Sequence, residues 1–204
     1  LWINIYQNDK KRSLLSRNKE LTNIVFENHL GSLKDKTDRM TSCALNIADS
    51  FKADTEQLKT AGSLSRCDLV TDIVTEFPDL QGIAGGYYCA EEGYEKDICI
   101  AVGDFYRPRY SGDELPRNRI GQCLSVADRL DTIVGLFGTG WVPSGVKDPY
   151  ALRRATIGLL RILIEGEINL DLQKAVEIAE TNYSDYSLNT KIVDEVLSFM
   201  NERL

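Results

Sequence analysis

Apolar side chains along this 204-residue chain return mostly at every third or fourth position, which is the spacing of one face of an α-helix. Half-buried strands would instead alternate apolar and polar residues. Two amphipathic stretches, 21–33 and 40–51, open the series on either side of the charged stretch 34–39. The pattern predicts an all-α fold with its first two bundle helices in these stretches.

The helical spacing continues through 54–77 and then meets Pro78. Proline removes a backbone donor and biases the preceding residue away from the helical region, so a helix should end near Phe77. Glycines at 82, 85 and 86 weaken the next segment unless another helix approaches closely there. We therefore predict a helix with close packing after Pro78.

The apolar residues in the middle of the chain indicate where the core lies. Residues 98–105 have a strand-like composition, but their length and neighbours favour a short helix that ends before the loop 107–118. The apolar face of 120–137 is wide enough for a central, buried helix. The predicted core consists of Leu69, Ile73, Phe77, Leu124, Ala127, Leu130 and Val134.

The last third predicts further helices. Asp148 is the expected N-cap of a helix over 150–165, with Pro149 at its first position. One further helix should start at Asn169 or Asp171, and a last helix should run over roughly 189–203. The polar stretch 182–187 resembles a linker. We therefore divide the chain into a helical domain with its N-terminal lead-in, 1–182, and a linker with the first helix of a following domain, 183–204.

Charge and composition exclude several classes of protein. The chain has 24 Lys and Arg against 31 Asp and Glu, a net charge of −7, which excludes a generally basic nucleic-acid coat. No apolar run approaches the roughly 20 residues that cross a bilayer, so we expect a soluble protein without a membrane partner. The chain begins with Leu1, and its first charges follow an apolar stretch, the reverse of a signal peptide. We expect a piece of a longer chain.

The cysteine and histidine content favours a reducing, cytoplasmic compartment and argues against metal chemistry. The five cysteines are an odd number and form no close pair. A single histidine, His29, leaves little for a His-based triad or a zinc site.

Two local patterns have simple structural explanations. The loop Gly140–Asp148 resembles a phosphate loop, but Lys147 comes one residue late and Asp148 occupies the hydroxyl position, so helix capping explains it better. Asp128 and Asp131 share a helix face, where a carboxylate pair is usually solvated or tied to Arg129 or a neighbouring loop.

The segment 104–161 is locally basic, with nine Lys and Arg against six Asp and Glu. Such a segment, with Tyr106 and Tyr110 as adjacent aromatic residues, could bind a phosphate backbone. The arginines could equally bind the carboxylates of this acidic chain. Both interpretations stay open.

Four strings carry a resemblance to a known family: DLVTDIVTEFPDLQG at 68–82, PRYSGDELP at 108–116, ADRLDTIVG at 127–135 and KDPYALRR at 147–154. Together they resemble the β subunit of bacterial-type, two-subunit glycyl-tRNA synthetase, in order and over essentially the whole chain. The resemblance implies a central piece of that subunit with an HD-like helical domain.

In that family, glycine activation with ATP and Mg belongs to the α subunit, and the β subunit is required for productive tRNA engagement. The resemblance thus implies a fragment that is noncatalytic by itself and holds no cofactor, with the α subunit and tRNA(Gly) as partners and no DNA. We expect tRNA-backbone contacts, or a structural clamp, at Arg107, Arg109, Lys147, Arg153 and Arg154. One of Arg153 and Arg154 should anchor the loop at 113–114.

The wider HD superfamily holds a metal ion with a His, a His-Asp pair and a distant Asp. The corresponding positions here are Thr41 or Ser42, the pair Cys67-Asp68, and Asp128, so both imidazoles are missing. We therefore expect a degenerate site with no metal and no catalytic residue. Two alternatives stay open: a metal-dependent HD-type phosphohydrolase and a helical spacer that contacts only protein.

Overall fold

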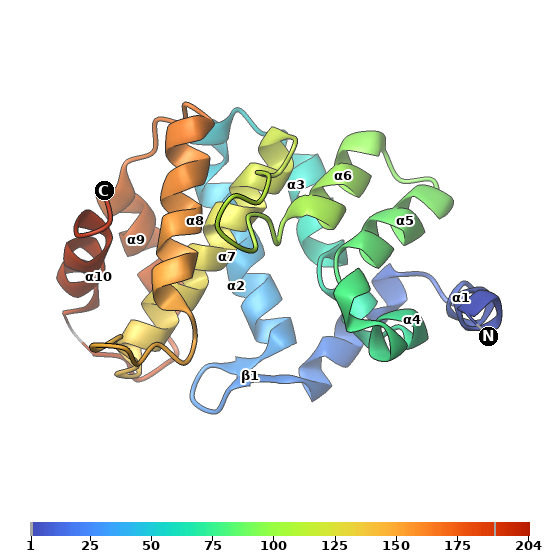
Figure 1. Ribbon diagram of the computed structural model, residues 1–204, viewed down its shortest axis with the longest axis horizontal. Helices are drawn as coiled ribbons and strands as arrows, with labels where there is room; N and C mark the ends of the chain where they lie inside the picture. The colour runs from blue at the N-terminus through green and yellow to red at the C-terminus, as the bar shows by residue number, and fades with distance from the viewer. Residues whose placement is uncertain (1, 190) are drawn as a thin grey trace.

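The computed structural model describes residues 2–189 and 191–204, and its backbone is dominated by helices, so the all-α prediction is confirmed (Figure 1). The helices α1 to α10 span Trp2–Asp9, Leu33–Phe51, Thr55–Leu64, Asp72–Glu76, Ile83–Glu91, Lys96–Asp104, Arg119–Gly138, Leu152–Glu165, Leu172–Thr181 and Ile192–Asn201. Short 3-10 helices, η1 to η3, span Leu15–Asn23, Cys67–Val70 and Pro78–Leu80. A small antiparallel sheet pairs β1, Val25–Glu27, with β2, Gly31–Ser32.

Helix α7 is the centre of the fold. It begins where the side chain of Asn118 accepts a hydrogen bond from the amide of Gly121, at 2.9 Å. Helices α2, α3, α6, α8, α9 and α10 all pack against it, and most of its residues are buried. In Figure 1 it runs through the middle of the molecule with α8 in front of it. The prediction of a central helix over 120–137 is confirmed.

The predicted core is correct apart from Phe77. Ile73 and the four predicted residues of α7 are buried, and Leu69 is half-buried against the core. Phe77 is 40% exposed. Helix α4 ends at Glu76, as Pro78 predicted, and the non-helical backbone of Phe77 turns its side chain out of the apolar stripe.

The prediction of a helix over 21–33 is wrong. This stretch forms the end of η1 and the two strands, although Leu21 and Leu30 are fully buried. Gly31 has a φ of 82°, which no regular helix allows, and Ser32 then starts α2 through a reciprocal capping box with Asp35. The charged stretch 34–39 therefore forms the first turns of α2.

Helices α5 and α6 pack with almost no space between their backbones. A Cβ atom on Gly86 would lie 3.1 Å from the carbonyl oxygen of Cys99 and 3.3 Å from the Cα of Gly103. Glycine at 86 therefore permits the close approach, and the predicted tightly packed helix after Pro78 is confirmed.

The start of α8 differs from the prediction. Asp148 does cap the helix, since its carboxylate accepts from the amides of Leu152 at 2.8 Å and Arg153 at 3.0 Å. The N-cap position, however, belongs to Ala151, whose φ of 54° lies in the left-handed region. Pro149 lies in the loop before the helix, and the Asp148 carboxylate reaches past it to the first helical amides.

Residues after 182 pack against the same core. Tyr183 donates to the carbonyl of Asp131 at 2.9 Å, and Phe199 of α10 meets Phe137 of α7 edge to face. The predicted start of α9 at Asp171 is confirmed, and α10 lies within the predicted range 189–203. Thr190 lies outside the described residues, as does Leu1. The proposed boundary at 182 stays a prediction.

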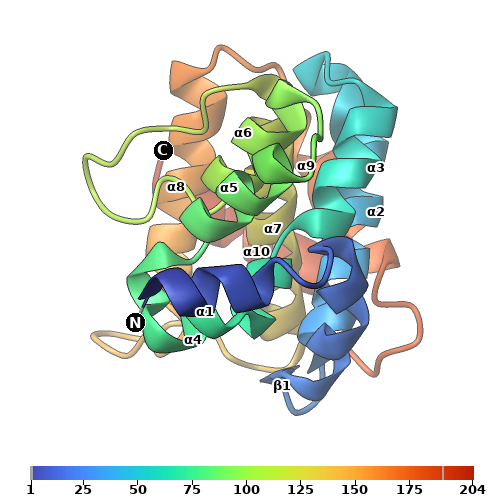
Figure 2. The same cartoon turned by 90° about the vertical axis from the view of Figure 1, so that its right-hand side faces the viewer.

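The opposite edge is formed by α1, which lies across α4 (Figure 2). The buried carboxylate of Asp9 accepts from the amides of Asp72 at 2.9 Å and Ile73 at 3.0 Å and from the Tyr88 hydroxyl at 2.9 Å. Within the described residues, no helix is both long and apolar enough to cross a membrane.

Candidate functional site

Two carboxylates of α7, Asp128 and Asp131, meet buried cations of α2. The Nζ of Lys36 lies 3.2 Å from an Asp128 oxygen and 3.0 Å from an Asp131 oxygen. Arg39, one turn along α2, donates from Nε to Asp131 at 2.8 Å. The shared helix face was predicted, but it turns toward α2 rather than toward solvent or Arg129.

Arg39 also holds the segment that follows α9. Its guanidinium lies 4.3 Å from the centre of the Tyr183 ring and donates to the Tyr186 hydroxyl at 3.1 Å. Burial alone would lower the pKa of Arg39, but Asp131 more than offsets this and raises it. Arg39 is therefore a fixed cation that joins α2, α7 and the residues after Asn182.

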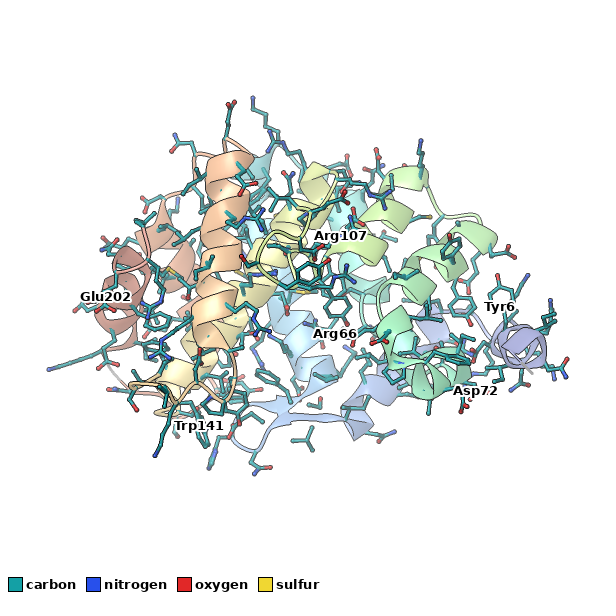
Figure 3. The ribbon with its side chains drawn as sticks, in the orientation of Figure 1. Tyr6, Arg66, Asp72, Arg107, Trp141 and Glu202 are labelled. Carbon is teal, nitrogen blue, oxygen red and sulfur yellow. The ribbon has the colours of Figure 1, made fainter. Side chains whose placement is uncertain are left out.

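A third cation, Arg66, forms an ion pair with Asp128. Its backbone is left-handed, with a φ of 64°, and its side chain is buried (Figure 3). Burial by itself would raise the pKa of Asp128, but Arg66 and Lys36 together hold that pKa well below its ordinary value. Asp128 is therefore an ionised carboxylate already neutralised by two cations.

Asp68 caps the start of α5 from a distance in sequence. One of its carboxylate oxygens accepts from the amides of Gly82 at 2.6 Å and Gly85 at 3.1 Å. Burial raises the pKa of Asp68 by more than these hydrogen bonds lower it. A Cβ on Gly85 would lie 3.2 Å from the accepting oxygen, so glycine leaves room for the carboxylate.

The other three positions of the expected degenerate site take part in helix packing. The Cys67 thiol donates to a carbonyl one turn earlier, and burial raises its pKa to about 12. The Thr41 hydroxyl donates to a carbonyl of its own helix while its side chain faces Gly62. The Ser42 hydroxyl donates to Asn182 at 2.9 Å.

These five positions do not fit a metal ion. Asp128 is bound by two cations, Asp68 by two amides, and the Cys67 thiol is protonated at neutral pH. Over the described ranges, no three His, Cys, Asp or Glu side chains cluster closely enough to hold one. The assignment of Thr41, Ser42, Cys67, Asp68 and Asp128 to a degenerate HD-type site stays a prediction.

Arg129, next to Asp128 in the sequence, fixes the long loop between α6 and α7. Its guanidinium donates to the carbonyl oxygens of Tyr106 at 3.3 Å and Pro108 at 2.7 Å. Burial lowers the pKa of Arg129 to about 10, against the opposing effect of Asp128. The loop is thus attached to α7 through its backbone.

Arg107 and Arg109 form ion pairs within that loop. Arg107 donates to Glu114 at 2.8 Å, and Arg109 donates to Asp113 at 3.0 Å from Nε. Burial would raise the pKa of Asp113, but the hydrogen bonds from Arg109 lower it. These two predicted tRNA contacts therefore already have carboxylate partners, the arrangement expected of a clamp.

The other three predicted contacts have different surroundings. The side chains of Lys147 and Arg154 are exposed, that of Arg153 is half-buried, and none of them forms a hydrogen bond or ion pair with another described residue. The prediction that Arg153 or Arg154 anchors the loop at 113–114 is wrong. Arg161, two turns along α8 from Arg153, donates instead to the carbonyl of Asp113 at 3.1 Å.

A cavity of about 440 Å³ brings some of these predicted residues together. We call it the Tyr106 pocket, and it lies between α7, α8, η3 and the loop 105–118. Its lining includes Gln81, Tyr106, Arg109, Asp128, Tyr150 and Arg154. Arg107, Lys147 and Arg153, and the positions 41, 42, 67 and 68, lie outside its lining.

The comparisons with known proteins identify the family. A sequence model described as the glycyl-tRNA synthetase beta subunit matches residues 5–204. The chain belongs to the glycyl-tRNA synthetase β-subunit family. It is 45% identical to the glycine–tRNA ligase beta subunit of Psychromonas ingrahamii over 97% of this chain, and 44% identical to that of Pseudomonas putida over 98%. It spans about 29% of the length of these glycine–tRNA ligase beta subunits.

Sequence reasoning missed the buried cations of this glycyl-tRNA synthetase β-subunit family member. Lys36 and Arg39 have the same three-residue spacing as Asp128 and Asp131, which is the one signal that could have paired the two helices. Arg66 gave no such signal, because it lies in a turn between η2 and α3.

Proposed function

We propose that this chain is a noncatalytic part of a glycyl-tRNA synthetase β subunit. In the complete enzyme it engages tRNA(Gly) and supports the subunit architecture while glycine is attached to tRNA with consumption of ATP. The family match over residues 5–204 carries this proposal. The substrates and partners belong to the whole enzyme, of which this chain is a fraction.

Unpaired surface cations support the tRNA contact. Phosphate binding by Lys and Arg requires cations that are accessible and not already neutralised. Lys147 and Arg154 are exposed, and like the half-buried Arg153 they have no carboxylate partner among the described residues. We assign these three residues to the tRNA backbone, and Arg107 and Arg109 to the structural clamp.

The reaction chemistry lies outside this chain in our proposal. ATP and Mg serve the complete enzyme, the α subunit activates glycine, and this chain holds no cofactor. We propose the cytoplasm as the location, where tRNA charging takes place. DNA and membranes are not partners.

The alternative of an HD-type phosphohydrolase is disfavoured by the surroundings of Asp128, since Arg66 and Lys36 occupy the space in which a metal ion would have to sit. The alternative of a protein-only helical spacer shares the same parent enzyme and differs only in lacking the RNA contact.

Single alanine substitutions at 107, 109, 147, 153 and 154 in the complete two-subunit enzyme test the proposal. Each variant is measured for melting temperature and for tRNA(Gly) affinity at several salt concentrations. Loss of a phosphate contact should lower the slope of log affinity against log salt by about one. We expect this for positions 147, 153 and 154, and a lower melting temperature for 107 and 109. If all five variants keep the wild-type affinity and slope, the tRNA contact is contradicted, and the protein-only helical spacer is the interpretation that remains.

A further inference from the structure

The Tyr106 pocket has the size and lining of a small-molecule site. Its volume of about 440 Å³ falls within the range of roughly 300 to 1,000 Å³ that is typical of ligand sites. Flat apolar surface comes from Tyr150, Pro78 and Pro108. Polar side chains that can donate and accept hydrogen bonds come from Gln81 and Thr132.

The charges around the pocket favour an anion. Arg154 and the buried Arg129 line it without forming an ion pair with another described residue, whereas Arg109, also in the lining, is paired with Asp113. Of the two acidic residues in the lining, Asp128 is neutralised by Arg66 and Lys36, which leaves Asp79. A phosphate group near Arg154 would therefore meet a net positive environment.

One polar group in the lining lacks a partner. The Tyr106 hydroxyl is buried and makes no hydrogen bond of normal geometry with a described residue, and the Gln81 side chain lies near it. An unsatisfied buried hydroxyl costs free energy, which a ligand with a hydrogen-bonding edge would recover. The same ring is held in place by Arg66, whose guanidinium lies 5.9 Å from its centre.

We propose that the Tyr106 pocket binds one unpaired ribonucleotide of the tRNA. Single-stranded RNA is recognised by stacking of splayed bases on aromatic side chains, with hydrogen bonds to the base edges and cations at the phosphate. Tyr150 supplies the stacking surface, Tyr106 and Gln81 supply the hydrogen bonds, and Arg154 binds the phosphate. This inference rests on the proposed tRNA engagement and locates it at one site.

Binding of nucleoside monophosphates to the 204-residue chain tests the site. AMP, GMP, CMP and UMP are titrated separately by calorimetry, with inorganic phosphate and the four nucleosides as comparisons. We expect saturable binding of at least one monophosphate, weaker binding of its nucleoside and weaker still of phosphate. Absence of saturable binding of all four up to about 10 mM overturns the proposal, given that 1 mM already corresponds to weak affinity.

Two substitutions assign the binding to this pocket. Tyr106→Phe removes only the hydroxyl and should weaken monophosphate binding about 5-fold. Arg154→Ala should weaken it about 10-fold and leave nucleoside binding within a factor of two. Lys174→Ala, which removes an exposed cation of α9 far outside the pocket lining, is the matched control and should change nothing. Melting temperatures verify that each variant is folded, and unchanged binding in both pocket variants overturns the assignment.

The same variants separate this inference from the proposed function. Tyr106→Phe should weaken tRNA(Gly) binding by the complete enzyme about as much as it weakens nucleotide binding, with no change in salt slope. If Tyr106→Phe leaves tRNA affinity unchanged while alanine at 147 and 154 lowers the salt slope, the pocket proposal fails and the tRNA contact stands. If none of these variants affects tRNA binding, both fail.

Discussion

Arg66, which is buried, and Asp128, which is partly buried, form an ion pair between residues that are 62 positions apart in the sequence. Arg66 precedes η2 with a left-handed backbone, and Asp128 lies in the middle of the central helix α7. Lys36 approaches the same carboxylate from α2. The carboxylate that the HD-type prediction assigns to a metal site is therefore part of the ionic framework of the fold.

Replacing Asp128 by Asn should lower the free energy of unfolding at pH 7 by about 3 kcal/mol, because Arg66 loses its only carboxylate partner among the described residues. The pKa of Asp128 is lowered in the folded state, so its contribution is complete above the unfolded pKa of about 3.9 and is lost as the pH falls through the folded pKa.

Urea unfolding of wild type and Asp128→Asn across pH is the measurement. The difference in stability should be constant between about pH 5 and pH 7 and should shrink below about pH 4. Asp185→Asn, which changes an exposed carboxylate that pairs with no described cation, is the control. A difference that already shrinks between pH 7 and pH 5 would contradict the lowered pKa.

The contact between Thr41 and Gly62 predicts an overpacked variant. A Cβ on Gly62 would clash with the Thr41 hydroxyl oxygen, so Gly62→Ala should destabilise the protein by about 1 to 3 kcal/mol. Thr41→Ala in the same chain removes the clashing atoms and should restore most of that loss. A double-mutant cycle by thermal unfolding measures the coupling. Additive effects would mean that Thr41 does not face α3.

Burial separates two apolar residues that the sequence alone treats alike. Leu130 is fully buried, and Leu130→Ala should cost about 2 to 5 kcal/mol through lost transfer energy and a cavity. Phe77 is 40% exposed, so Phe77→Ala should cost far less despite removing a larger side chain. Denaturant unfolding of both variants compares them directly, and equal losses would contradict the described end of α4.

The role of Asp68 as a cap predicts the response to substitution and to metal ions. Asp68→Ala leaves the amides of Gly82 and Gly85 without their acceptor and should cost about 1 to 3 kcal/mol, whereas Asp68→Asn keeps an oxygen and should cost less.

Manganese or magnesium should neither raise the melting temperature of the wild type nor produce phosphate release from phosphate esters. Elemental analysis of the purified protein completes this test. Stoichiometric bound metal, together with hydrolysis that is lost in both Asp68→Ala and Asp128→Ala, would restore the phosphohydrolase alternative.

The helices could be predicted from the sequence because their apolar spacing is long and regular, as in α7 and α8. The structure of the stretch 21–33 could not be predicted in this way. Leu21 and Leu30 are core residues, but Gly31 and the N-cap Ser32 prevent a continuous helix from reaching α2. The spacing of apolar residues predicts which residues are buried more reliably than it predicts the secondary structure of their backbone.

The candidate site was less accessible to prediction, since its contacts are long-range. The sequence motif singles out Asp128 as a candidate site residue. Its partners Lys36 and Arg66 lie 92 and 62 residues away, and no motif connects them to it. Arg107 and Arg109 were grouped with Arg154 by charge alone. Only the folded loop distinguishes the two arginines that have carboxylate partners from Arg154, which has none among the described residues.

Site-specific photo-cross-linking to tRNA(Gly) tests the central claim, that the surface around Arg154 contacts tRNA, most directly. A photoreactive residue replaces exposed Tyr110 or Ile157, which lie in one groove with Arg154, or exposed Val25 in β1 as the control. In the complete two-subunit enzyme, our account predicts tRNA cross-links from positions 110 and 157 and none from position 25. Absence of cross-links from both 110 and 157, in variants that still charge tRNA, would contradict it.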